Sequence, residues 1–414
     1  MYTWFTIFDM ARDLSASVPI ILFGAFDRHN FGDLLFPHIA ATLLGADDLI
    51  FAGLAERDMR GYGGHQVMAL SKLAEELEGR QVKIIHVGGE LLTCDTWEAA
   101  VMLLPPDEVQ QTLARFNKHP EEKLEWARRQ LELSTLVPYT LPPHLFQRET
   151  RSIYLAVGGV ELGERDIAMQ TEVSAHLKAA TAVSVRDKRT LALLRQDGIQ
   201  ASLIPDPAVM VAELFSKDID HHAQEGEVAQ MRSTFPQGYI AVQFSADFGD
   251  DATLIKIAAQ LDQLAISTGY GVVFFRAGAA PWHDDLLSYK RVLAHMRTRS
   301  VQILASLYLW DICALIANSR AYCGSSLHGR IVAMAYALPR INLIHPSLKQ
   351  RPGKQAAFAA TWESTDMPAT VEVDKMARGI NLALATNPVQ RLQTAHNLAV
   401  QFRQGFVEII TKLD

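Results

Sequence analysis

Short apolar runs alternate along this chain with amphipathic helical patterns, and the alternation occurs in two successive series. The apolar runs cover residues 18–24, 47–53, 82–90, 152–157, 182–185 and 201–204 in the first series, and 239–244, 272–275, 301–304, 321–323 and 340–344 in the second. Strands of a parallel sheet are buried on both faces and need crossover helices between them. The pattern therefore predicts an α/β fold with two Rossmann-like, doubly wound sheets.

The two series also predict the domain organisation of the 414-residue chain. We expect residues 18–207 and 208–385 to form two domains that face a cleft, because ligands of open parallel sheets gather at the carboxyl ends of the strands. Charged, helical residues at about 106–145 are interpreted as an insertion in the first domain. Residues 386–414 are expected to form a C-terminal helix, whose apolar stripe needs a partner surface. Within the domains, residues 65–78 are interpreted as a helix and residues 216–227 as a polar linker.

The amino-acid composition limits the classes of protein to which this chain can belong. A hydrophobic content of 49% with 21% charged residues is typical of a soluble globular protein. The formal net charge of −7 argues against a general nucleic-acid binder. Cys94, Cys313 and Cys323 have no metal-ligand spacing, and His221-His222 lies in the expected linker, so we predict no metal site. Near the N-terminus the apolar residues are interrupted by Asp9, Arg12 and Asp13, so this segment is not expected to be a signal peptide. No apolar run reaches about 18 residues, and we therefore predict a cytoplasmic protein without a transmembrane segment.

Residues that follow the predicted strands are candidates for ligand binding. Asn30, Gly32 and Asp33 lie between the first apolar run and a helix, although Asp33 is equally suited to capping that helix. Gly89 and Glu90 end the third run, where glycine allows a ligand to approach the backbone or simply forms a turn. Neither half contains Gly-x-Gly-x-x-Gly or a P-loop, which excludes a standard dinucleotide site or a P-loop kinase.

The stretch from Arg320 to Ile341 predicts strand, turn, helix, turn and strand. Ser325 and Ser326 are suitable N-cap residues, so His328 lies in the first helical turn. That turn offers unpaired backbone N–H groups and the positive end of the helix dipole to a carboxylate or phosphate, beside a titratable imidazole. The alternative interpretation is a partly buried histidine that only begins the helix.

Three separated motifs, in this order, resemble those of the polysaccharide pyruvyl transferase family. They are Asn-Phe-Gly-Asp at 30–33, Ser-Val-Arg-Asp at 184–187 followed by Pro-Asp-Pro at 205–207, and Ser-Ser-Leu-His at 325–328. The resemblance implies a GT-B-like fold whose C-terminal helix returns to the N-terminal domain. It further implies a transferase of exopolysaccharide biosynthesis that moves pyruvate from phosphoenolpyruvate to a sugar as a ketal. We expect the acceptor on the first domain and the donor on the second.

One position departs from the family pattern, because Ser326 stands where the family has arginine before Leu-His. A hydroxyl cannot replace the bidentate grip of a guanidinium on an anion, so we expect Arg330 or Arg276 to supply that charge.

The chemistry assigns roles to the remaining candidates. Protonation of the enol methylene suits His328, and removal of a hydroxyl proton suits Asp33. Arg186 is expected to hold the donor, unless it serves an ion pair with Asp187 or another carboxylate. The residues predicted to bind substrate are Asn30, Gly32, Gly89, Glu90, Asp187, Arg276, Ser325, Ser326, Leu327, Gly329 and Arg330.

Two other functions stay open on the same scaffold. One is a GT-B-type glycosyltransferase that uses a nucleotide sugar, and the other is a non-catalytic carbohydrate-binding relative. For the pyruvyl transferase we expect no cofactor besides the donor substrate, and a saccharide acceptor. A lipid-linked acceptor would bring the protein into peripheral contact with a membrane.

Overall fold

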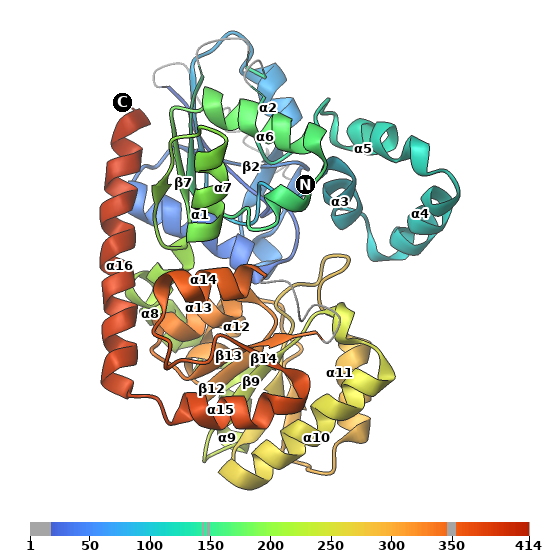
Figure 1. Cartoon of the computed structure of the whole chain (residues 1–414), viewed down its shortest axis with the longest axis vertical. Helices are drawn as coiled ribbons and strands as arrows, with labels where there is room; N and C mark the ends of the chain where they lie inside the picture. Colours follow the sequence, from blue (N-terminus) through green and yellow to red (C-terminus); the bar gives the residue numbers. More distant parts are fainter. Residues whose placement is uncertain (1–17, 143–144, 147–149, 346–352, 414) are drawn as a thin grey trace, which may run out of the picture.

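The computed structural model describes residues 18–142, 145–146, 150–345 and 353–413, which form two α/β halves (Figure 1). The first sheet has the spatial order β3 (Arg57–Asp58), β4 (Gln66–Ala69), β2 (Leu49–Gly53), β1 (Ile20–Phe23), β5 (Val82–His86), β6 (Thr150–Val157), β7 (Ala182–Val185) and β8 (Ser202–Leu203). The second has the order β11 (Val301–Ile303), β10 (Gly271–Phe274), β9 (Tyr239–Gln243), β12 (Ala321–Gly324), β13 (Arg340–Ile344) and β14 (Thr370–Glu372). Neighbouring strands pair in parallel except β3 with β4. The predicted fold class is confirmed.

The strand orders place a switch point in each sheet. In the first sheet β1 lies between β2 and β5, so the chain winds away from β1 in both directions. In the second sheet β9 lies between β10 and β12 in the same way. Crevices at such points are where open α/β sheets bind ligands. The loops that follow β1, β5, β9 and β12 are therefore the loops that build the site.

Helices cover the sheets and form the connections between strands. Their bounds are α1 (Phe31–Leu44), α2 (Leu70–Glu76), α3 (Thr96–Met102), α4 (Pro106–Lys118), α5 (Lys123–Leu131), α6 (Ile167–Ala179), α7 (Lys188–Gln196), α8 (Val211–His222), α9 (Gly226–Thr234), α10 (Asp251–Thr268), α11 (Leu286–His295), α12 (Leu309–Ala317), α13 (Leu327–Ala335), α14 (Lys354–Trp362), α15 (Met376–Leu384) and α16 (Pro388–Ile410). Helices α4 and α5 project from the body of the first half (Figure 1). Among the described helices, none has the length and apolarity needed to cross a bilayer.

Helix α16 runs along one side of both halves and ends beside the first (Figure 1). At its beginning, Arg391 donates a hydrogen bond to the carbonyl of Ala337 in the second half, at 2.8 Å. Near its end, Gly405 packs against Ile204, which follows β8. Phe402 and Phe406 are buried in the hydrophobic core that both halves share. The expected return of the C-terminal helix to the N-terminal domain is confirmed.

Two local predictions were wrong. Residues 66–69 form strand β4 instead of the start of a helix, because they extend the sheet by pairing with β2. Residues 216–227 are helical in α8 and α9 instead of a linker, since Ile219 is fully buried in the core and His222 contacts Asp311 at 2.7 Å. The divisions at 207/208 and 385/386 stay predictions; β8 ends at Leu203 and β9 begins at Tyr239.

Candidate active site

A pocket of about 670 Å³ lies where the switch points of the two sheets meet. Several of the predicted residues from both halves line it: Asn30, Asp33, Glu90, Arg186, Ser325, Ser326, Leu327 and His328. The structure therefore brings Asp33, Arg186 and His328 to one pocket, although they are distant in the sequence.

His328 is held in place by the other half of the molecule. Ser326 caps α13 by accepting a hydrogen bond from the N–H of Gly329 at 3.2 Å, which fixes the first turn. The imidazole stands edge-on to the ring of Phe36, with the centroids 5.1 Å apart. It also packs closely against Gly32, where a Cβ would be 1.9 Å from Nδ1. Gly32 thus serves the site through close packing.

Arg186 is occupied by two carboxylates of its own domain. Its Nη2 lies 2.5 Å from Glu90 and its Nη1 lies 2.9 Å from Asp206, and the residue is 1% exposed. Burial by itself lowers the pKa of this guanidinium, but the two carboxylates outweigh burial and raise the pKa. A Cβ on Gly158 would lie 2.4 Å from Glu90 and 2.6 Å from Arg186, so only glycine leaves room for this pair.

Asp206 connects the arginine to the histidine and was missed as a site residue in the sequence. Its Oδ2 lies 3.8 Å from Nε2 of His328, and its Oδ1 accepts a hydrogen bond from the N–H of Ala208 at 2.9 Å. Burial raises the pKa of Asp206, yet the contacts with His328 and Arg186 outweigh burial and leave that pKa below its usual value. The Pro-Asp-Pro motif was the available signal. Glu90, Arg186, Asp206 and His328 form one continuous chain of polar contacts.

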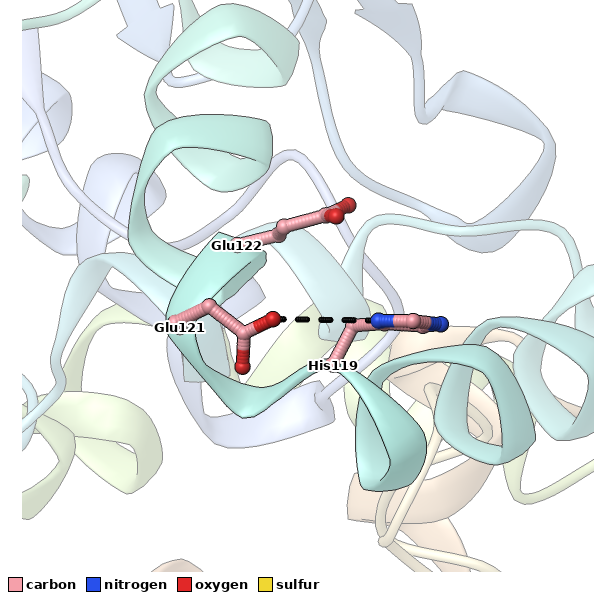
Figure 2. A group of neighbouring side chains, drawn as sticks. All are labelled: His119, Glu121 and Glu122. Atoms are coloured by element: carbon pink, nitrogen blue, oxygen red, sulfur yellow. Dashed lines mark ion pairs between the residues drawn. The ribbon is translucent and has the colours of Figure 1, made fainter.

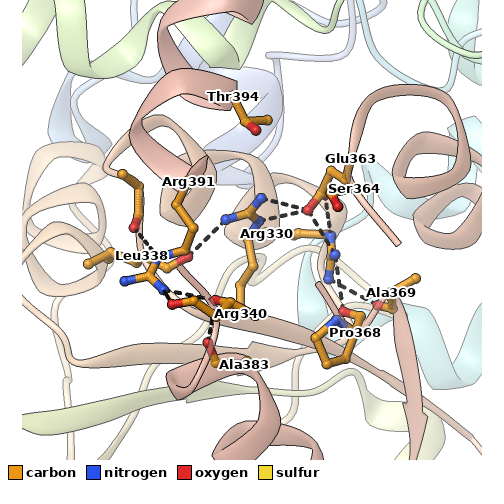
Figure 3. A network of polar contacts seen from close by, with 12 residues as sticks. Arg330, Leu338, Arg340, Glu363, Ser364, Pro368, Ala369, Ala383, Arg391 and Thr394 are labelled. Atoms are coloured by element: carbon orange, nitrogen blue, oxygen red, sulfur yellow. Dashed lines mark hydrogen bonds and ion pairs between the residues drawn. The ribbon is translucent and has the colours of Figure 1, made fainter. Parts of the chain in front are cut away.

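The prediction that Arg330 supplies a cation to the pocket was wrong. Arg330 is fully buried and donates to both carboxylate oxygens of Glu363, at 2.7 and 3.0 Å, and to the carbonyls of Pro368 and Ala369 (Figure 3). Arg340 shares the same carboxylate at 2.6 Å. Two residues along a helix correspond to a rotation of roughly 200°, so Arg330 points away from the side on which His328 meets the pocket.

Other predicted residues also lie outside the pocket lining. Asp187 caps α7 by accepting from the N–H of Thr190 at 2.7 Å. Gly89 has a φ of 100°, which favours glycine, and its carbonyl accepts from the N–H of Gly158 at 2.7 Å. Gly329 packs against the ring of Tyr322. Arg276 is half-buried and is not among the residues that line the pocket.

Arg28 provides a positive group that the sequence interpretation missed. It lines the pocket, is 8% exposed and donates a hydrogen bond to the Tyr139 hydroxyl. Asp27 is only a loose ion-pair partner at 3.9 Å. Nε of Arg28 is buried and has no hydrogen-bond partner within the described part of the chain, and the same holds for Nε2 of His328. The sequence feature that could have indicated Arg28 was its position in the loop after β1. Lys354, the first residue of α14, lines the pocket as well.

A second polar network positions the start of α13. The carboxylate of Asp284 accepts hydrogen bonds from Gln243 at 2.7 Å and from the N–H of Ala277 at 2.6 Å. The amide oxygen of Gln243 in turn accepts from the N–H groups of Ser325 and Ser326, at 3.1 and 2.8 Å. Burial raises the pKa of Asp284 to about 7. Neither Gln243 nor Asp284 was predicted, because each acts through residues distant in the sequence.

A group with ligand types suited to a metal lies outside this pocket, on the helical insertion. His119, Glu121 and Glu122 have their ligand atoms within 4.8 Å of one another, and all three are exposed. Figure 2 shows the contact between His119 and Glu121, which spans 3.7 Å. Glu122 is also 3.4 Å from Arg115. Exposed side chains that already have such partners do not define a metal site.

Comparisons with known proteins agree with this architecture. The family model of polysaccharide pyruvyl transferase matches residues 149–346. No curated protein matches the chain. Among solved structures, the UDP-GlcNAc 2-epimerase from Neisseria meningitidis bound to UDP-GlcNAc is similar, with a TM-score of 0.55 and 12% identity over 96% of this chain and 100% of that chain. The UDP-GlcNAc 2-epimerase from Methanocaldococcus jannaschii has a TM-score of 0.52 and 10% identity over 92% and 99% of the two chains.

These epimerase structures share the fold with this chain, and at such low sequence identity the similarity supports no conclusion about activity or substrate. The family model is independent of them and spans two of the three motifs, those at 184–187 and 325–328, as well as Asp206. Residues 149–346 of this chain therefore match the polysaccharide pyruvyl transferase family model, and the chain as a whole has a GT-B-like fold.

Proposed function

We propose that this protein transfers the pyruvyl group of phosphoenolpyruvate to two hydroxyls of a sugar as a ketal, with release of inorganic phosphate. One observation carries the proposal beyond the family match. The pocket is lined by two buried side chains, Arg28 and His328; Nε of Arg28 and Nε2 of His328 have no hydrogen-bond partner among the described residues, although Asp206 lies 3.8 Å from the latter. Unpaired buried donors are rare and costly, so they indicate an absent ligand that accepts hydrogen bonds or carries negative charge.

The donor's two anionic groups match what the pocket offers. Arg28 supplies the charge that Ser326 lacks, and Lys354 adds a second cation from α14. The first turn of α13 contributes backbone N–H groups that have no intrahelical partner. Arg186 is not assigned to the donor here, because Glu90 and Asp206 already balance its charge. Its proposed role is to hold Asp206 against His328.

The reaction then follows from the side chains that face the donor. His328 donates a proton to the methylene carbon of phosphoenolpyruvate, which leaves a cation stabilised by oxygen at the neighbouring carbon. One sugar hydroxyl adds to that carbon while Asp33 accepts its proton. The bond from this carbon to the phosphate oxygen breaks, and a second hydroxyl adds in its place. The methyl group gains one of the two hydroxyl protons overall, and the other leaves with the phosphate.

Asp206 suits this use of His328. Its carboxylate is completely buried and lies 3.8 Å from Nε2, so it places a fixed acceptor beside the imidazole and orients the ring. Arg186 keeps that carboxylate ionised in a buried place. A well-placed acid of this kind contributes roughly 10² to 10⁴-fold in rate.

The test is phosphate release from phosphoenolpyruvate across a panel of saccharide acceptors. His328→Ala should lower kcat by about 10² to 10⁴-fold with little change in the KM for phosphoenolpyruvate. Arg28→Met should instead raise that KM by roughly tenfold, since one charge-assisted hydrogen bond is worth about 1.5–3 kcal/mol. His396→Ala, an exposed change on α16, is the matched control. Undiminished kcat in the His328 variant would remove the catalytic proposal.

A binding experiment separates the donor from a nucleotide sugar. A ligand at about 100 times its Kd stabilises the folded protein by about 2.7 kcal/mol, which a thermal shift detects. We expect phosphoenolpyruvate to stabilise the wild-type protein, and the tenfold weaker binding of Arg28→Met to reduce this stabilisation to about 1.4 kcal/mol at the same concentration. Stabilisation by UDP-GlcNAc, with none by phosphoenolpyruvate, would favour a nucleotide-sugar transferase on the same scaffold.

A further inference from the structure

Trp282 is an unusual residue at the pocket. It lines the pocket, yet 44% of its surface is exposed, which is high for a large aromatic side chain. Its φ is 64°, a left-handed backbone conformation that bulky residues rarely adopt. Strained residues of this kind persist where the surroundings fix them, and they cluster at ligand sites. The conformation therefore calls for an explanation from function.

The loop that carries Trp282 is tightly held on both sides. The N–H of Ala246 donates to the carbonyl of His283 at 2.7 Å, and the N–H of Asp284 donates to the carbonyl of Gly278 at 3.1 Å. Nδ1 of His283 is 3.0 Å from the carbonyl of Pro281. A Cβ on Gly278 would be 2.5 Å from the His283 ring, so the loop is closely packed. The indole is thus presented to the pocket by a fixed backbone.

The indole does not suit the donor. The face of an aromatic ring carries the negative end of its quadrupole, which disfavours contact with a phosphate or a carboxylate. That face accepts the weakly positive C–H groups of a pyranose ring, which form a flat apolar surface of similar size. A pocket of about 670 Å³ also has more space than a three-carbon donor fills.

Polar groups beside Trp282 complete such a site. The hydrogen bond between Ala246 and His283 brings two segments together. Asp247 follows Ala246 in one segment, and Trp282 precedes His283 in the other. Asp247 is exposed, lines the pocket and accepts a hydrogen bond from the hydroxyl of Ser245 at 3.2 Å. The N–H of Ser245 donates to the hydroxyl of Ser325 at 3.0 Å, so these groups connect to the start of α13.

We propose that Trp282 is the platform on which a pyranose ring of the acceptor stacks, with Asp247 and Ser245 binding its hydroxyls. The identification of that ring as the acceptor rests on the function proposed above. The acceptor then contacts the second domain through the loop after β10, whereas the sequence pattern had favoured the first domain alone.

The test measures sugar binding directly and does not require turnover. The probes are the methyl pyranosides of glucose, galactose, mannose and N-acetylglucosamine, followed by saturation-transfer NMR and titration, with uridine as a comparison. Trp282→Gly should weaken binding of the pyranoside that binds best by roughly tenfold, and Trp282→Phe should retain most of it. Leu287→Ala, an exposed apolar change on neighbouring α11, should bind as the wild type does.

The glycine variant also guards against simple misfolding. Because glycine adopts a φ of 64° without steric cost, Trp282→Gly should keep the melting temperature of the wild-type protein while losing the sugar. Its stabilisation by phosphoenolpyruvate should be unchanged.

Three results would overturn the proposal: a wild-type protein that binds none of the pyranosides, a glycine variant that binds them as tightly as the wild type, or binding of uridine alone. Loss of sugar binding in a protein that never binds phosphoenolpyruvate would support the platform and reject only the donor.

Discussion

Gly32→Ala tests whether the position of His328 matters for chemistry. The added Cβ would lie 1.9 Å from Nδ1 and 2.1 Å from Cγ of the imidazole, whereas real Cβ contacts essentially never fall below 3.0 Å. The imidazole and α1 must therefore separate by at least about 1.1 Å, the difference between 3.0 and 1.9 Å. A displacement of about 1 Å at a reacting group can cost roughly 10²-fold in rate, so kcat should fall by about that factor.

The stability of the same variant should change much less. Gly32 lies in the first turn of α1 without a positive φ, so alanine gains up to about 1 kcal/mol in helix propensity. Overpacking of a buried site costs about 1–3 kcal/mol in the opposite direction. The net loss in the free energy of unfolding is therefore about 0–3 kcal/mol, which is less than the usual total stability of about 5–15 kcal/mol. The expected signature is a large loss of kcat with a small loss of stability.

The assays are steady-state phosphate release and urea denaturation on the same preparations. Gly61→Ala is the matched control, because its added Cβ meets nothing within 4 Å and its φ is ordinary. It should match the wild type in both assays. Wild-type kcat in a folded Gly32→Ala protein would show that the ring can move without consequence, and the proposed role of His328 would then be refuted.

Two further predictions concern buried charges. Glu363→Gln leaves Arg330 and Arg340 without their shared carboxylate and should cost about 3–5 kcal/mol in urea denaturation, whereas Glu225→Gln on the surface should cost little. An equal loss in both would contradict the buried network. Asp284 binds its proton more tightly in the folded state, with a pKa of about 7 against an ordinary 3.8, so folding stability should fall as the pH rises between these values. Asp284→Asn should remove this slope, worth at most about 4 kcal/mol, from stability curves measured between pH 4 and 8; an unchanged slope would assign it to other groups.

The sequence predicted the parts of the fold that depend on burial and local pattern. The runs expected at 182–185 and 340–344 appear as strands β7 and β13 with the expected bounds, because their sheets are covered on both faces. Strand β4 was not predicted because its four residues also fit a helical pattern with Leu70 and Leu73. Its pairing with β2 determines that they form a strand and not a helix. Pairing between distant segments is a tertiary effect that local periodicity does not contain.

The candidate site was predictable only as far as the loops that build it. Asp33, Arg186 and His328 follow strands at the switch points, so topology alone brings them to one pocket. The direction and partners of each charge were not predictable. The sequence allowed Arg186 to be assigned to the donor because it does not reveal that Asp206 and Glu90 surround this side chain. Charges next to each other in the fold can be far apart in the sequence, and pairing decides which of them remain available.

In the proposed function, the distribution of charge compensates for the serine at position 326. The available guanidinium is that of Arg28, which follows β1 in the first half, while His328 belongs to the second. A donor bound to both would therefore span the two halves. These halves are joined beside the pocket, because the N–H of Phe31 donates to the carbonyl of Ala277 at 2.8 Å and the amide of Asn30 lies 3.3 Å from the His283 ring. The motif at 30–33 thus joins the two halves beside the pocket, and in the proposed function it sets the separation between the cation of Arg28 and the acid of His328.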